Sequence, residues 1–126
     1  VTALEISRKR AERLLENLTR TKLSAKVVIR DFHKFKSKNL FDIVLVDAPC
    51  SSTGTFRRNC DLQYLSPYKR VDTLVQDQIS IVKKAMLLVK PGGRLLYCTC
   101  SLSSLEGSFP WRCMSIPSSG IFVILI

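Results

Sequence analysis

The chain has 126 residues, enough for one domain with a modest core, and 46% of them are hydrophobic, which excludes a largely disordered protein. No stretch is long enough to span a bilayer as an apolar helix. The net charge of +10 favours a polyanionic partner, nucleic acid first and an anionic membrane surface second. A solvated basic surface without a specific partner explains the charge equally well.

Hydrophobic periodicity predicts strands that alternate with helices. Apolar runs predict four strands, at residues 1–6, 26–31, 41–47 and 95–99. The first and third of these are expected to be buried, the third on both faces because nearly all its residues are apolar. Ser7 is the predicted N-cap of a first helix, and a second helix is predicted over residues 72–90, where Pro91 to Gly93 end it.

This order of elements predicts the α/β class, with a parallel sheet. The character of the sequence changes near its end: residues 109–120 show no clear period, and residues 121–126 form an apolar run without a turn or a charge. We therefore expect one structural unit over residues 1–106 and a divergent tail over residues 107–126 that packs poorly.

Three acidic residues stand at the ends of the first three predicted strands: Glu5, Asp31 and Asp47. In an open α/β sheet such residues face the ligand crevice, and an acid after the second strand typically accepts hydrogen bonds from ribose hydroxyls. Each acid alone is more often a solvated turn residue. Three at consecutive strand ends favour a nucleoside-type cofactor.

Two cysteines follow predicted strands in the same way, Cys50 after the third and Cys100 after the fourth. Pro49 stiffens the exit toward Cys50, so the thiol is held in a defined direction. Adjacent parallel strands would bring both thiols into one crevice beside Asp47. The alternative is a pair of buried structural cysteines. Arg57 and Arg58 could lower the pKa of a thiol there.

Five cysteines without the spacing of a disulfide framework predict free thiols in a reduced compartment, and residues 1–6 show no signal-peptide pattern. A zinc site built from Cys50, Cys60, Cys98 and Cys100 is disfavoured, because no second close Cys/His pair accompanies Cys98 and Cys100. A Cys98–Cys100 redox couple is a weaker alternative. We expect no metal.

Two long motifs carry a family resemblance. Residues 40–58 run Leu40-Phe-Asp-Ile-Val-Leu-Val-Asp-Ala-Pro-Cys-Ser-Ser-Thr-Gly-Thr-Phe-Arg-Arg58, and residues 91–102 run Pro91-Gly-Gly-Arg-Leu-Leu-Tyr-Cys-Thr-Cys-Ser-Leu102. Both, in this order, closely resemble the RNA (cytosine-5-)-methyltransferases of the RsmB/Nop2/Sun type, and the likeness runs from Val1 to about Glu106. It implies a partial Rossmann-like, S-adenosylmethionine-dependent methyltransferase sheet, mostly parallel, in a three-layer α/β/α arrangement.

The resemblance also implies roles for single residues. Cys100 matches the family's nucleophile, which adds to C6 of cytosine, and Cys50 matches the second cysteine, which helps release the product. Asp47 would lie at the cofactor and the cytosine edge. Glu5 would hold the cofactor's ribose and Asp31 would lie beside its adenine. Arg57 and Arg58 match a basic pair in the loop after the first motif and would contact the RNA.

The implied function is methylation of cytosine C5 in RNA, with rRNA favoured over tRNA, by a cytoplasmic monomer without a membrane partner. The family's glycine-rich cofactor loop, Asp-x-Cys-Ala-Ala-Pro-Gly-Gly-Lys, has no counterpart in these 126 residues. The first residue is Val rather than Met, which favours a piece of a longer protein, and a changed reading frame near Ser108 would explain the tail. The alternative function is a catalytically inactive, truncated remnant that binds RNA non-specifically.

Overall fold

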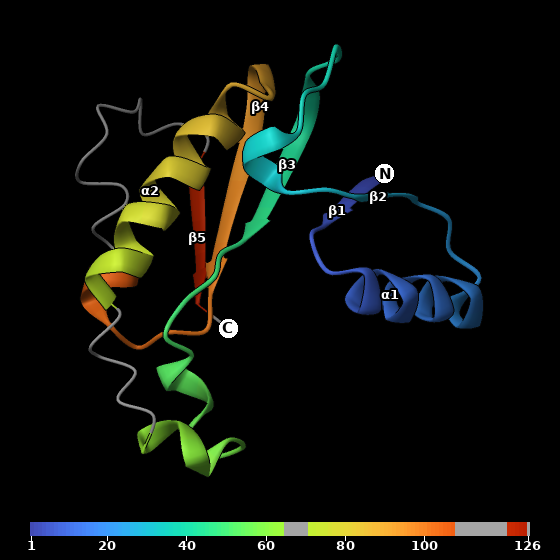
Figure 1. The fold of residues 1–126 in the computed structure, drawn as a ribbon. Helices are drawn as coiled ribbons and strands as arrows, with labels where there is room; N and C mark the ends of the chain where they lie inside the picture. Colours follow the sequence, from blue (N-terminus) through green and yellow to red (C-terminus); the bar gives the residue numbers. More distant parts are fainter. Residues whose placement is uncertain (65–70, 108–120, 126) are drawn as a thin grey trace. The chain divides into compact units, whose positions relative to one another are not determined.

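The computed structural model describes residues 1–64, 71–107 and 121–125, and its chain divides into two compact units, Val1–Ser37 and Lys38–Ile126 (Figure 1). Residues 109–120, for which the sequence predicted no clear element, lie outside the described residues. Within the described ranges, no helix is long and apolar enough to cross a membrane.

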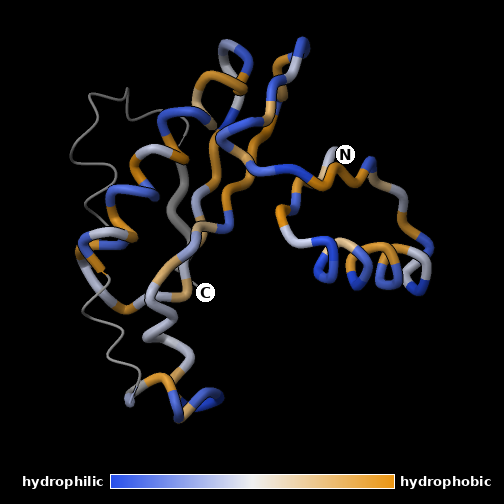
Figure 2. Tube along the Cα trace, in the orientation of Figure 1, coloured by the Kyte–Doolittle hydropathy of each residue, from blue (hydrophilic) through white to orange (hydrophobic). Residues whose placement is uncertain are grey.

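The first unit is a strand–helix–strand motif with a short 3-10 turn. Its elements are β1 (Thr2–Glu5), α1 (Arg8–Thr21), β2 (Lys26–Ile29) and η1 (Phe32–Lys34). The two strands pair in parallel and α1 contacts both. Ser7 is the N-cap, as predicted: its side chain accepts a hydrogen bond from the Arg10 N–H. The alternating hydropathy of α1 is visible in Figure 2.

The expected burial of the first strand is wrong, because β1 is half-buried at most. A single helix covers this two-stranded sheet, so part of each strand stays accessible. The helix itself buries one small residue fully, Ala11, while its arginines and lysines extend into solvent. The first unit therefore depends on a thin apolar layer between α1 and the two strands.

The second unit is a three-stranded parallel sheet with one long helix. Its elements are β3 (Phe41–Asp47), η2 (Thr53–Thr55), η3 (Cys60–Gln63), α2 (Val71–Met86), β4 (Val89–Thr99) and β5 (Ile121–Leu125). The strand order is β3-β4-β5, and α2 runs along one face of the sheet (Figure 1). The predicted α/β class with parallel strands is confirmed.

Each unit has its own set of paired strands. In the described residues, β2 pairs with β1 alone, and β3 pairs with β4 alone. The periodicity of a sequence gives the number and direction of its strands but not which strands are lateral neighbours.

The second helix ends at Met86 and not at residue 90, because Val89 already belongs to β4. The Leu88 carbonyl accepts a hydrogen bond from the Phe41 N–H, which starts the sheet directly after the helix. Pro91 to Gly93 consequently lie inside β4, in an irregularity where Phe41 pairs with Val89 and Ile43 with Arg94. Gly92, at φ 76°, allows the chain to turn there.

The core of the second unit lies between α2 and one face of the sheet. The buried helix residues include Val71, Val75, Ile79, Val82 and Ala85, and the buried strand residues include Val46, Leu95 and Tyr97. The expectation that the third strand is buried on both faces is wrong, since Ile43 and Leu45 are 60% and 62% exposed. Alternate residues of a strand point to opposite faces, and α2 covers only the face of Val46.

The end of the tail contains a strand. Residues 121–125 form β5, which pairs in parallel with Leu95 to Thr99 of β4. An apolar run of five residues is too short to show a periodicity that would separate a strand from irregular chain. Its pairing partner depends on the rest of the sheet. Backbone pairing therefore incorporates a segment that was expected to pack poorly.

Candidate active site

The two cysteines that follow β3 and β4 lie side by side. In the parallel register Asp47 pairs with Cys98, so both strands end at the same level of the sheet. The residues just beyond them meet: Cys50 Sγ lies 3.2 Å from Cys100 Sγ. The predicted convergence of these thiols at the carboxyl edge of the sheet is present in the structure, and Cys50 rather than Cys98 is the neighbour of Cys100.

Backbone hydrogen bonds hold the two exit loops together on both sides of the thiols. The Ala48 N–H donates to the Cys98 carbonyl at 3.0 Å, and the Gly54 N–H donates to the Cys100 carbonyl at 2.9 Å. The second contact requires glycine, because a Cβ atom at position 54 would lie 2.7 Å from the Cys100 carbonyl oxygen. The thiol pair is thus built on a closely packed, hydrogen-bonded pair of loops.

A buried carboxylate lies beneath these loops. Glu106 is fully buried and accepts four hydrogen bonds: from the Ser51 N–H at 2.8 Å, the Ser51 hydroxyl at 2.5 Å, the Ser101 hydroxyl at 2.5 Å and the Gln78 amide at 3.1 Å. The same Gln78 amide donates to the Pro49 carbonyl at 2.8 Å. Four donors fill the lone-pair positions of a carboxylate. The site therefore suits an ionised Glu106.

Sequence reasoning did not identify Glu106 or Gln78 as site residues. Burial alone raises the pKa of Glu106, but the hydrogen bonds from Ser101, Ser51 and Gln78 outweigh it and hold that pKa below its ordinary value. The available signal was a single acidic residue shortly after Cys100, in the run Ser104 to Gly107.

The two thiols differ in acidity. Burial raises the pKa of Cys50, yet hydrogen bonds from the Thr99 side chain, the Cys100 thiol and backbone N–H groups together hold it below its ordinary value. Burial also raises the pKa of Cys100; the Ser52 hydroxyl, 3.5 Å away, opposes the rise, and the negative charge of Cys50 adds to it. Of the two thiols, Cys50 is therefore the more acidic.

The other predicted residues of this unit lie around the thiol pair. Asp47, the last residue of β3, is exposed, as expected for a group that faces solvent or a ligand. Arg57 and Arg58 are exposed between η2 and η3. The groups that lower the pKa of Cys50 are its hydrogen-bond donors, not these arginines as the sequence suggested. No cluster of three metal-ligating side chains occurs among the described residues.

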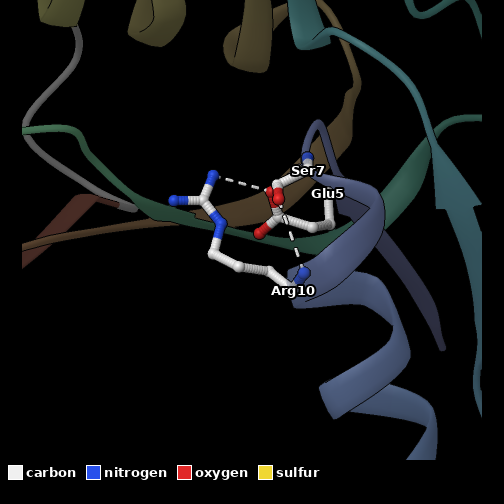
Figure 3. A network of polar contacts seen from close by, with 3 residues as sticks. All are labelled: Glu5, Ser7 and Arg10. Atoms are coloured by element: carbon white, nitrogen blue, oxygen red, sulfur yellow. Dashed lines mark hydrogen bonds and ion pairs between the residues drawn. The ribbon is translucent and has the colours of Figure 1, made fainter.

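Glu5 and Asp31 belong to the first unit, at the carboxyl ends of its two parallel strands. Glu5 Oε1 accepts hydrogen bonds from the Arg10 guanidinium and the Ser7 N–H, both at 2.7 Å (Figure 3). The guanidinium first, and then the N–H, hold the pKa of Glu5 below its ordinary value. Asp31 caps η1 by accepting from the His33 N–H at 2.7 Å.

Comparison with known proteins shows the family of the chain. The family model of the 16S rRNA methyltransferase RsmB/F matches residues 1–109. The chain belongs to this family. It is 38% identical over 109 residues to the ribosomal RNA small subunit methyltransferase B of Vibrio vulnificus, covering 84% of this chain and 26% of that protein. The corresponding protein of Sodalis glossinidius is 40% identical over 105 residues, covering 81% and 24%.

A solved structure has the same fold. The crystal structure of PH0851 aligns with a TM-score of 0.83 at 33% identity and covers 88% of this chain and 26% of that one. This likeness supports the predicted partial Rossmann-like methyltransferase fold and the predicted family. The chain spans about a quarter of the length of the curated relatives it matches.

Proposed function

We propose that this chain is part of the catalytic domain of an rRNA methyltransferase that modifies C5 of cytosine through a covalent cysteine adduct. The observation that carries the proposal is the pair of thiols 3.2 Å apart at the ends of two parallel strands. Membership of the RsmB/F family supports rRNA as the substrate, ahead of tRNA. The surplus of basic residues suits an RNA partner.

The chemistry explains the need for a thiolate. C5 of cytosine is too electron-poor to attack a methyl donor directly, and addition of a thiolate to C6 makes it nucleophilic. We assign to Cys50 the step that ionises the nucleophile: its thiolate accepts the Cys100 proton across the 3.2 Å contact. The Cys100 thiolate then forms the S–C6 bond, and N3 of the base takes up a proton, a step that we assign to Asp47 at the end of β3.

Product release uses the second thiol. Cys50 is half-buried, so it can return its proton to water and become a thiolate again. That thiolate removes the proton from C5, the electron pair re-forms the C5–C6 double bond, and the S–C6 bond to Cys100 breaks as N3 loses its added proton. A lowered pKa at Cys50 suits this role, because it makes this thiol the more readily ionised of the two.

The residues of the first unit fit the nucleoside end of S-adenosylmethionine. Both hydrogen bonds to Glu5 go to Oε1, which leaves Oε2 for ribose hydroxyls, and Asp31 stands at the neighbouring strand end, where an adenine contact is expected. When bound, this cofactor supplies the methyl group as an electrophile. The backbone amides that would hold its methionine end are not among these 126 residues, so the fit covers the nucleoside alone.

The experiment is transfer of labelled methyl to small-subunit rRNA by the full-length protein, followed by mapping of the modified base. We expect 5-methylcytosine, abolished by Cys100→Ala and unaffected by Cys60→Ser, which replaces an exposed cysteine outside the pair. Methylation at another base atom, or full activity of Cys100→Ala, would refute the proposal.

The net charge supports a second candidate function, RNA binding without catalysis. The net charge of +10 would give RNA binding without catalysis if this chain alone were the working protein. Affinity for RNA would then fall steeply with salt and would not respond to S-adenosylmethionine. Saturable cofactor binding by the 126-residue chain in calorimetry would argue against it.

A further inference from the structure

Each of the two cysteines is followed by a serine, and the serines are paired as the cysteines are. Cys50 is followed by Ser51 and Cys100 by Ser101. The Ser51 and Ser101 hydroxyl oxygens lie 3.0 Å apart, beside the sulfur pair at 3.2 Å. The two loops therefore meet in two adjacent contacts, one between sulfurs and one between hydroxyls.

The carboxylate of Glu106 binds both serine hydroxyls. Its Oε2 accepts from both serine hydroxyls, and its Oε1 accepts from the Ser51 N–H. Each hydroxyl has one proton, so donation to Glu106 turns both oxygens into acceptors. This matches the surroundings of the Ser101 oxygen: the Ser103 N–H donates to it at 3.0 Å, and the Thr53 hydroxyl lies 3.2 Å from it.

Only an anion fits this pattern of donors. A neutral amide at position 106 would direct its N–H groups to one of two places. They would face the two serine hydroxyls, whose protons would lose their acceptor, or they would face the Ser51 N–H and the Gln78 amide, which are donors themselves. An unsatisfied buried polar group is costly, so the loops would separate or rearrange. Gln78 extends the same restraint to the residue before Cys50, through the Pro49 carbonyl.

We propose that Glu106 is a positioning residue that sets the separation of the Cys50 and Cys100 thiols by binding the serine next to each. The inference rests on the proposed function for its catalytic meaning, whereas its structural content concerns the thiol pair alone. Glu106 contacts neither thiol and acts through Ser51 and Ser101. It links three segments of the second unit: the two exit loops and, through Gln78, α2.

The test measures how strongly the two thiols are held together, by the reduction potential of a Cys50–Cys100 disulfide formed in glutathione buffers. One oxidised glutathione is consumed, the disulfide forms and two reduced glutathiones are released, and peptide mass spectrometry identifies the bridged cysteines. For Glu106→Gln we expect the equilibrium constant for disulfide formation to fall about tenfold, which is a potential less negative by roughly 30 mV. Ser51→Ala, which removes one donor, should shift it in the same direction by less.

Two controls separate positioning from stability. Glu16→Gln removes an exposed carboxylate of the other unit and should change nothing. Gly93→Ala introduces a Cβ atom 2.8 Å from the Asp42 carbonyl oxygen, at the opposite end of β3 and β4, and should lower the free energy of unfolding without moving the potential. An unchanged potential in both Glu106→Gln and Ser51→Ala, or an equal shift in Gly93→Ala, would overturn the proposal.

A parallel assay on the full-length protein tests the catalytic meaning. With labelled rRNA, Glu106→Gln should lower kcat for methyl transfer at least tenfold and leave KM for RNA within about twofold, because Glu106 is fully buried and acts through the loops that carry the thiols. A shifted potential with unchanged kcat would refute the catalytic role and retain the positioning. An inactive parent protein would instead count against the proposed function.

Discussion

Replacement of Gly54 by alanine is the sharpest perturbation of the thiol pair. The new Cβ atom would lie 2.7 Å from the Cys100 carbonyl oxygen, and ordinary contact needs 3.4 Å, so one loop must move by about 0.7 Å (3.4 − 2.7). The hydrogen bond from the Gly54 N–H to that carbonyl, now 2.9 Å, is stretched by the same movement.

The magnitude follows from these two effects. Overpacking of a close contact costs about 1–3 kcal/mol, so the free energy of unfolding should fall by that amount. A displacement of this size is large beside the 3.2 Å separation of the sulfurs, so disulfide formation between Cys50 and Cys100 should weaken by about tenfold, or roughly 30 mV.

Urea unfolding followed by circular dichroism measures the first quantity, and glutathione titration with peptide mapping measures the second. Gly93→Ala is the matched control, because it adds a comparable clash, 2.7 Å from Val89 Cγ1, far from the thiols. The reasoning is refuted if Gly54→Ala keeps both the stability and the disulfide potential of the parent chain.

Three further predictions concern titration and capping. Because the folded chain holds the pKa of Glu106 below its ordinary 4.5, the stabilising effect of this carboxylate is complete above pH 4.5 and is lost as the pH falls through the folded value. Glu106→Gln should therefore make the free energy of unfolding depend less on pH below 4.5. An unchanged slope in the variant would contradict this. At neutral pH iodoacetamide should modify Cys50 before Cys100, since the pKa of Cys50 is lowered and that of Cys100 is raised. The reverse order in mass spectrometry would contradict this ranking of the two thiols by acidity. Ser7→Ala should lower helix stability by about 0.5 kcal/mol, the low end for an N-cap, because the Ser7 to Arg10 N–H contact is long at 3.4 Å; Ser7→Asp, measured alongside by thermal unfolding, should retain it.

The convergence of Cys50 and Cys100 could be predicted from sequence because it depends on two local properties. Each cysteine follows an apolar run of strand length, and parallel neighbours end at one edge of a sheet. The N-cap at Ser7 is equally local, since an acceptor side chain before a periodic run is sufficient to predict it.

Other features depend on partners distant in sequence. The burial of Glu106 requires Ser51, 55 residues earlier, and Gln78, 28 residues earlier, so no local pattern marks it. Val89 continues the apolar period of α2, yet its pairing with Phe41 places it in β4. Ile43 is exposed because α2 covers the other face of the sheet. The composition of the strand does not predict which face a helix will cover.

The mechanism is tested most directly by trapping its covalent intermediate. The full-length Cys50→Ala variant is mixed with small-subunit rRNA and S-adenosylmethionine and analysed on a denaturing gel. If Cys50 releases the product and Cys100 is the attacking thiol, the variant should accumulate a protein–RNA adduct that survives denaturation, and the additional change Cys100→Ala should abolish it. An adduct that persists in the double variant, or no adduct from Cys50→Ala in a protein whose parent methylates the RNA, would contradict the proposed roles of the two thiols.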